Sequence, residues 1–207
     1  MKLSRLRKIT WRLLLVYAVL VAVIALAERS PRKWRRWNFV AGTSLLAAAC
    51  ALRLWAAGHL VKNRVLTVTG PYAYVKNPLY IGTFLGMVGF ALAARGDPRD
   101  PWYLRHFSAM VLGAALLAFV FYYVPRKKRR EGERLRELFG DAWDHYDRSV
   151  PDYLPRLRPY ERAQHRRWSW KAACENSEPW TALAVAAGLA AVVWNGWLLE
   201  QASRLFR

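Results

Sequence analysis

Gly70-Pro71-Tyr72-Ala73-Tyr74-Val75-Lys76-Asn77-Pro78-Leu79-Tyr80-Ile81-Gly82 is a polar, aromatic and turn-rich segment that lies between two strongly apolar runs. Within the hydrocarbon of a bilayer, irregular backbone is tolerated only where protein covers it or where it lines a cavity. A loop of this composition, flanked by apolar runs, predicts the mouth of a membrane helix bundle. It is therefore a candidate ligand site.

The composition favours a membrane protein over a basic soluble one. The chain has 207 residues, 55% hydrophobic content, 11 Trp and a formal net charge of +19. Such a charge is also typical of nucleic-acid-binding proteins. Here, however, the basic residues cluster between long apolar runs, as the positive-inside bias of membrane proteins produces. We therefore expect membrane lipids, and no nucleic acid, among the partners.

Five apolar runs are candidates for membrane spans, which need about 20 residues each. They cover residues 11–27, 39–57, 79–94, 107–124 and 180–199. Aromatic residues stand near their ends, as interfacial belts require, namely Trp11, Trp34, Trp37, Trp102, Tyr103, Tyr122, Tyr123 and Trp180. The pattern predicts an all-α polytopic bundle of about five transmembrane helices that forms a single membrane domain over residues 1–207.

The distribution of Lys and Arg favours a cytoplasmic N-terminus. It predicts a multi-pass protein of the bacterial inner membrane with its site facing the cytoplasm. The basic cluster at 29–36 conflicts with this orientation, because it would lie on the outer side. The conflict disappears if the first two apolar runs form a hairpin that does not fully cross the bilayer.

The charged segment 126–148 predicts a cytoplasmic amphipathic helix. Its apolar stripe follows helical spacing, through Leu135, Leu138, Phe139, Ala142 and Tyr146. At about 100° per residue, Glu131 falls on this apolar side and Lys127 lies one turn before it. Glu133 and Glu137 fall on the solvated side. A carboxylate aimed at an apolar interface is costly without a partner, which favours a functional role for Glu131.

Two spaced motifs resemble those of the isoprenylcysteine carboxyl methyltransferase family and its bacterial relatives. The first motif consists of Gly70, Tyr72, Lys76, Asn77, Pro78, Tyr80 and Gly82. The second consists of Glu131, Leu135, Phe139, Gly140, Tyr146, Val150 and Pro151. With the preceding segment, the resemblance covers residues 53–155, about half of the chain. Three residues depart from the family pattern: Asn77 replaces His, Gly132 replaces a second Glu, and Trp143 replaces Tyr.

The resemblance implies S-adenosylmethionine-dependent methylation of a lipophilic acceptor that reaches the site from the bilayer, either a small molecule or a lipidated substrate. It implies that segment 126–155 completes the pocket, that Lys127 faces the substrate, and that catalysis is by positioning, with no general base assigned. No cluster of His and Cys in the sequence suggests a metal site. The implied cofactor-binding residues are Arg64, Val65, Leu66, Thr67, Tyr72, Asn77, Pro78, Leu79, Tyr80 and Glu131. This set suits a cationic sulfonium cofactor, because it offers a carboxylate and aromatic faces.

Two other functions remain open from the sequence. The first is an NADPH-dependent membrane reductase of the steroid 5-alpha-reductase type, since those proteins also place an Asn-Pro pair ahead of a span. The second is a non-enzymatic relative that binds lipid or a partner, which the departures at Asn77 and Gly132 favour. Separately, the spacing of Gly82, Gly86 and Gly89 predicts close helix packing.

Overall fold

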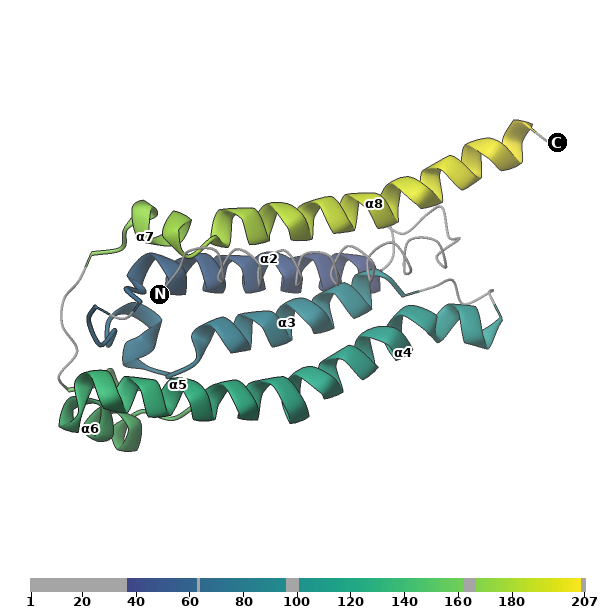
Figure 1. Cartoon of the computed structure of the whole chain (residues 1–207). Helices are drawn as coiled ribbons and strands as arrows, with labels where there is room; N and C mark the ends of the chain where they lie inside the picture. The colour runs from purple at the N-terminus through teal and green to yellow at the C-terminus, as the bar shows by residue number, and fades with distance from the viewer. Residues whose placement is uncertain (1–36, 63, 96–100, 162–166, 206–207) are drawn as a thin grey trace, which may run out of the picture.

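The structure is a computed structural model that describes residues 37–62, 64–95, 101–161 and 167–205. These residues are helical or irregular, with no strand among them. The longer helices lie roughly alongside one another, and the short ones gather at one end (Figure 1). In chain order they are α2 (Trp37–His59), the 3₁₀ turn η2 (Gly70–Ala73), α3 (Pro78–Ala93), α4 (Trp102–Ala118), the π-helical turn η3 (Phe119–Tyr123), α5 (Val124–Phe139), α6 (Asp141–Ser149), α7 (Trp170–Glu175) and α8 (Glu178–Leu205).

Two of these helices are long and apolar enough to cross a membrane. They are Trp37–His59 and the continuous helix His106–Phe139, and only 22% and 17% of their apolar windows are buried within the protein. A helix at the core of a soluble protein would be mostly covered, whereas these helices turn most of their apolar surface outward. Helix α3 is apolar but shorter. The predicted all-α fold is thus confirmed for the described residues, and two of its helices are candidate membrane spans.

Exposed aromatic residues mark the two ends of each candidate span. Trp37 and Trp55 of α2 are both exposed and lie about 27 Å apart at 1.5 Å per residue. Tyr103 and Tyr122 on the α4–η3 helix are also exposed, with a separation of about 28 Å. These lengths match a hydrocarbon core of about 30 Å with aromatic residues at its interfaces.

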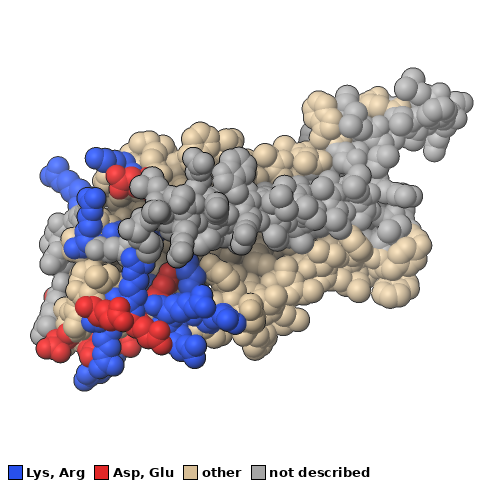
Figure 2. All heavy atoms as spheres, viewed as in Figure 1, with Lys and Arg blue, Asp and Glu red and all other residues tan. Residues whose placement is uncertain are grey.

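Helix α5 extends α4 beyond the apolar region. The helix His106–Phe139 has 34 residues and is about 51 Å long, which exceeds the hydrocarbon core by about 20 Å. The excess is the charged half, and the described Lys, Arg, Asp and Glu side chains gather at this end of the molecule (Figure 2).

The prediction of one continuous helix over 126–148 is wrong, because the helix is interrupted in its middle. The chain turns at Gly140, whose φ of 50° lies in the left-handed region that glycine favours, and this separates α5 from α6. As a result Ala142 is exposed, whereas Tyr146 is buried.

Of the five predicted spans, 39–57 lies in α2, 79–94 largely in α3, 107–124 in the α4–α5 helix and 180–199 in α8. The run 11–27 lies outside the described residues, so the five-helix count is not confirmed.

Helices α2 and α3 pack backbone against backbone through glycine. A Cβ placed on Gly42 would lie 2.4 Å from the backbone nitrogen of Ala93 and 2.5 Å from the carbonyl oxygen of Gly89. A Cβ on Gly89 would lie 2.8 Å from the carbonyl oxygen of Gly42. Gly82 makes room for the side chain of Arg53. The predicted packing role of the α3 glycines is therefore confirmed.

A bidentate ion pair joins α8 to this helix pair. The Nε and Nη2 atoms of Arg53 donate to the two carboxylate oxygens of Glu178 at 3.0 and 2.7 Å. The Nη1 atom donates to the carbonyl oxygen of Leu79 at 3.1 Å and also contacts Thr83. Glu178 is buried. Arg53 therefore links α2, α3 and α8 within the bundle.

The contacts between residues 72–77 and residues 146–152, which we call the clasp, join two segments that are distant in sequence. The Tyr146 hydroxyl donates to the carbonyl oxygen of Tyr72 at 2.7 Å. The backbone nitrogens of Lys76 and Asn77 donate to the carbonyl oxygens of Pro151 and Asp152, at 2.9 and 3.2 Å. Beneath these bonds Tyr146 packs in an apolar cluster with Val68, Val150 and Tyr160.

Ion pairs complete the clasp. The Lys76 side chain is only 8% exposed, and its ammonium lies 2.6 Å from an oxygen of Asp147 and 3.1 Å from an oxygen of Asp152. Lys128 of α5 also pairs with Asp152. Partial burial raises the pKa of the Asp152 carboxyl, but hydrogen bonds from Lys128 and Lys76 outweigh it, so this pKa lies below its usual value.

We predict that Gly42→Ala destabilises the protein by about 1–3 kcal/mol, because the added methyl overpacks the α2–α3 contact. Thermal unfolding of the detergent-solubilised protein measures this loss. The matched control is Gly113→Ala in α4, where an added Cβ meets no atom within 4 Å. That substitution should be neutral or stabilising by up to about 1 kcal/mol, as helix propensity predicts. Equal melting temperatures for the two variants would contradict the packing role.

The clasp also predicts a pH dependence of stability. Because the folded-state pKa of Asp152 is depressed, its stabilisation is present above the usual value of 3.8 and is lost as pH falls through the folded-state pKa. Asp152→Asn should lower stability near neutral pH by about 1 kcal/mol or less, since solvent screens the pair. The gap between the melting temperatures of wild type and variant should then close in acid.

Glu137→Gln is the control for this measurement, because Glu137 is an exposed α5 carboxylate with no ion pair among the described residues. Its melting curve should follow that of the wild type across the same pH range. If the difference in melting temperature between wild type and Asp152→Asn stays constant into strong acid, the charge of the Asp152 carboxylate contributes nothing to stability.

Candidate functional site

Tyr80, in the first turn of α3, is the centre of the candidate site. Its hydroxyl donates to a carboxylate oxygen of Glu131 at 2.8 Å. The ammonium of Lys127 lies 3.3 Å from the other oxygen of Glu131 and 5.8 Å from the centre of the Tyr80 ring. The sequence predicted that Glu131 and Lys127 lie on the apolar side of their helix, and the structure places both against Tyr80. We call Tyr80, Tyr123, Lys127 and Glu131 the Tyr80 cluster.

The π-helical turn η3 aligns the α5 side of this cluster. The backbone nitrogen of Val124 donates to the carbonyl oxygen of Phe119, five residues earlier. The wider turn keeps Phe119 and Tyr123 on one side, with their rings stacked at 5.6 Å. The Tyr80 ring meets Phe119 edge-on, and the Lys127 ammonium lies 5.7 Å from the centre of the Tyr123 ring. Such π turns often occur at functional sites.

Two further polar groups lie near the cluster. Tyr72 is buried, and its hydroxyl is the one buried side-chain polar atom in the described residues that has no hydrogen-bond partner. Burial raises the pKa of that hydroxyl. Lys62 follows the end of α2, and desolvation of its ammonium, together with the like charge of Lys127, lowers its pKa. A carboxylate, two ammonium groups and phenolic hydroxyls are thus available for polar contacts.

The other predicted site residues have structural roles or lie apart. Pro78 begins α3, and the carbonyl oxygen of Leu79 accepts from Arg53. The Asn77 amide donates to the carbonyl oxygen of Asp152 at 3.2 Å, so it belongs to the clasp. The hydroxyl of Thr67 accepts from the backbone nitrogen of Val61 at 3.2 Å.

In the described part of the chain, no hydrogen bond or ion pair joins residues 64–66 to the Tyr80 cluster. Arg64 and Val65 are exposed and make no hydrogen bond or ion pair in the described part of the chain. Leu66 packs against the apolar cluster beneath the clasp. The structure therefore brings together Tyr80, Lys127 and Glu131 but does not join residues 64–67 to them. That the predicted residues hold S-adenosylmethionine stays a prediction.

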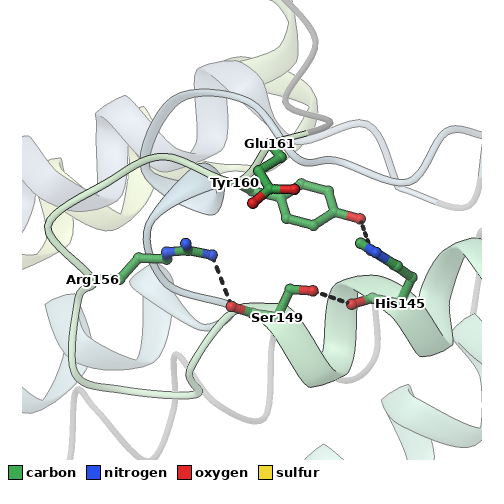
Figure 3. Close-up of a pocket in the computed structure, with 5 residues that line it drawn as sticks. All are labelled: His145, Ser149, Arg156, Tyr160 and Glu161. Carbon is green, nitrogen blue, oxygen red and sulfur yellow. Dashed lines mark hydrogen bonds between the residues drawn. The ribbon is translucent and has the colours of Figure 1, made fainter.

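Sequence reasoning missed a pocket next to α6. It has a volume of about 280 Å³ and is lined by His145, Ser149, Arg156, Tyr160 and Glu161 (Figure 3). His145 Nδ1 lies 2.7 Å from the Tyr160 hydroxyl, and the Arg156 guanidinium donates to the carbonyl oxygen of Ser149 at 2.9 Å. Because these groups hydrogen-bond to one another, we interpret the pocket as part of the scaffold. No spacing in the sequence signals it, since Tyr160 lies fifteen residues beyond His145.

Most residues of the two sequence motifs hold the fold rather than line the cluster. Gly70 has a φ of 58°, Pro78 begins a helix and Gly140 ends one. Tyr146, Val150 and Pro151 belong to the clasp. Among the described residues, no group of three or more His, Cys, Asp or Glu side chains could hold a metal ion.

Comparison with known proteins identifies two relatives. The chain is 31% identical over 159 residues to the nickel-cobalt-cadmium resistance protein NccN of Alcaligenes xylosoxydans xylosoxydans, which covers 75% of this chain and 67% of NccN. It is 31% identical over 110 residues to the cobalt-zinc-cadmium resistance protein CzcN of Cupriavidus metallidurans, which covers 52% of this chain and 44% of CzcN. The second match thus spans less than half of that relative. No protein-family profile and no solved structure matches.

These relatives overturn the functional prediction. They are named for metal resistance, so the assignment to the isoprenylcysteine carboxyl methyltransferase family, the expected methyltransferase activity and the alternative reductase are wrong. The physical reason is that the motif residues behind the resemblance mostly fix turns, helix ends and the clasp, and a shared scaffold does not carry a shared chemistry. The match to NccN covers two thirds of that protein, and the chain belongs to the family of this nickel-cobalt-cadmium resistance protein.

Proposed function

We propose that this protein is a membrane-embedded component of bacterial resistance to divalent heavy-metal ions such as Ni²⁺, Co²⁺, Cd²⁺ and Zn²⁺. The observation that carries the proposal is the 31% identity to NccN over three quarters of this chain. CzcN, the second relative, is named for resistance to cobalt, zinc and cadmium, which adds zinc to the metals named for NccN. The proposal gives the protein a part in resistance and assigns no metal ligands.

The proposed setting is the inner membrane, crossed several times. Helices α2 and α4–η3 supply two spans, to which we add α3 and α8. Helix α3 is apolar over 16 residues, and α8 has 28 residues. With the apolar run 11–27, these helices make five spans. The charged end would then face the cytoplasm, in agreement with the positive-inside rule.

We further propose that the Tyr80 cluster is the part of the protein on which resistance depends. It supplies an ammonium and a carboxylate beside two aromatic rings, at the point where the apolar part of the α4–α5 helix ends. The buried Tyr72 hydroxyl without a partner supports the proposal, because an unpaired buried polar group is costly and often has a functional explanation.

Growth in the presence of metal tests the proposed function. A bacterium whose own copy of the gene has been deleted is compared with the same strain carrying the full chain, and the inhibitory concentrations of Ni²⁺, Co²⁺, Cd²⁺ and Zn²⁺ are measured. We expect the chain to raise at least one of these concentrations severalfold, with no change in tolerance to a detergent. Equal metal tolerance in the two strains would refute the proposal.

A pair of matched variants tests the site. Glu131→Gln removes the carboxylate that holds Lys127 and Tyr80, and we expect it to abolish most of the gain in metal tolerance. Glu133→Gln makes the same change two residues away, at an exposed position, and should retain the gain. Immunoblots of the membrane fraction must show equal amounts of both variants. Equal tolerance with Glu131→Gln and Glu133→Gln would place the function elsewhere.

A further inference from the structure

We propose that the charged end of the molecule binds the headgroups of anionic phospholipids in the surrounding leaflet. The surface has two parts. The arginine face consists of Arg126, Arg129 and Arg130, on the outer side of α5. The leucine loop is the segment 153–158, which follows the clasp and carries Leu154 and Leu157.

Both parts lie at the level where the hydrocarbon should end. The apolar run 107–124 ends at Val124, and the arginine face begins half a turn later. Asp152 is held at the same level, because it pairs with Lys128 of α5 and accepts from Asn77, the residue before α3. The leucine loop leaves directly from Asp152. Headgroup phosphates would therefore surround both parts.

The basic residues 126–130 lie on two different sides of α5. Lys127 and Lys128 are partly exposed, but both are paired, with Glu131 and Asp152 respectively. Arg126, Arg129 and Arg130 are exposed, with Arg126 stacked 5.5 Å over the Tyr122 ring. Of the three, only Arg129 has an ion pair among the described residues, a solvated one with Glu133 at 3.9 Å. The outer charges are therefore available to an external anion.

The arginine face is preceded by exposed aromatic residues. Phe121 is 75% exposed and Tyr122 is 66% exposed. Such rings suit the boundary between acyl chains and headgroups, where the ring is apolar and the hydroxyl is wet. Along η3 and α5, exposed aromatic residues are thus followed by arginines. This order matches a phospholipid, in which the acyl chain is followed by the phosphate.

The leucine loop exposes apolar surface that the protein does not cover. Leu154 is 81% exposed and Leu157 is 98% exposed. The loop is nevertheless held in place, since Arg156 bonds to the carbonyl oxygen of Ser149 and its backbone nitrogen donates to Tyr74. Ordered leucines beside an exposed Arg158 are typical of segments that insert apolar side chains among lipid headgroups while cations bind phosphate.

An anionic leaflet is the occupant that this arrangement fits. Its charge complements the arginine face, and it is already adjacent to a helix that spans the bilayer. Basic residues next to a span attract anionic lipids at short range, and salt weakens this attraction. A soluble acidic partner would not need the two leucines to lie at the level of the membrane boundary.

Lipid selectivity in reconstituted vesicles tests the arginine face. The full chain is placed in phosphatidylcholine vesicles, and the association of spin-labelled phosphatidylglycerol is compared with that of spin-labelled phosphatidylcholine. We expect a preference for the anionic lipid that falls with added salt. Arg129→Gln with Arg130→Gln should reduce the preference by up to about 25-fold, since each charge contributes at most about fivefold.

The matched control removes two charges further from the boundary, with Arg134→Gln and Arg148→Gln, both of which are exposed. It should retain most of the preference. An equal loss in both double variants would show that net charge alone acts, and an unchanged preference in Arg129→Gln with Arg130→Gln would exclude the arginine face. Either result overturns this part of the proposal.

Fluorescence quenching tests the leucine loop. A fluorophore is attached to Leu157→Cys, and to Arg148→Cys as the control, after Cys50 and Cys174 have been replaced. We expect lipids with a shallow spin label to quench the label at 157, and aqueous iodide to quench the label at 148. Strong iodide quenching at 157 would show that the loop faces water and would overturn its insertion.

Discussion

The clasp is the contact on which the rest of this arrangement depends. The Lys76 ammonium is nearly buried, and a buried charge is tolerated only when it is paired and hydrogen-bonded. Asp147 and Asp152 supply the partners from a segment some seventy residues away. This requirement fixes α5 and α6 against the loop that precedes α3. In this arrangement the Tyr80 hydroxyl donates to Glu131 of α5 at 2.8 Å.

The sequence could predict the features that depend on local pattern. Apolar length identified the regions of α2, α3 and α4. Helical spacing predicted that Glu131 and Lys127 share one side of their helix, and both contact Tyr80 in the structure. Features that depend on backbone geometry or on distant partners were not predictable. The α5 stripe continues through Gly140, so spacing alone cannot reveal the turn there. Arg53 and Glu178 are 125 residues apart, and no pattern in the chain relates them.

The two motifs misled the functional prediction for a structural reason. Gly70, Pro78 and Gly140 set turns and helix ends, whereas Tyr146 and Pro151 accept or donate the bonds of the clasp. A chain that keeps this clasp keeps the motif spacing, whatever reaction or transport step its site serves. Motif spacing therefore reports the scaffold, and function must be argued from relatives and from the site itself.

The basic run 126–130 shows how one sequence feature can serve two surfaces. Because successive helix residues point in different directions, the two lysines of the run pair with Glu131 and Asp152, whereas its three arginines lie on the outer side. Replacing Lys127 would leave Glu131 without its cation and would disturb the site, whereas replacing Lys128 would leave Asp152 paired with Lys76 alone. Replacing Arg129 or Arg130 would leave those pairs intact and change only the surface. Substitutions within five consecutive residues can thus separate the site from the attachment to the leaflet.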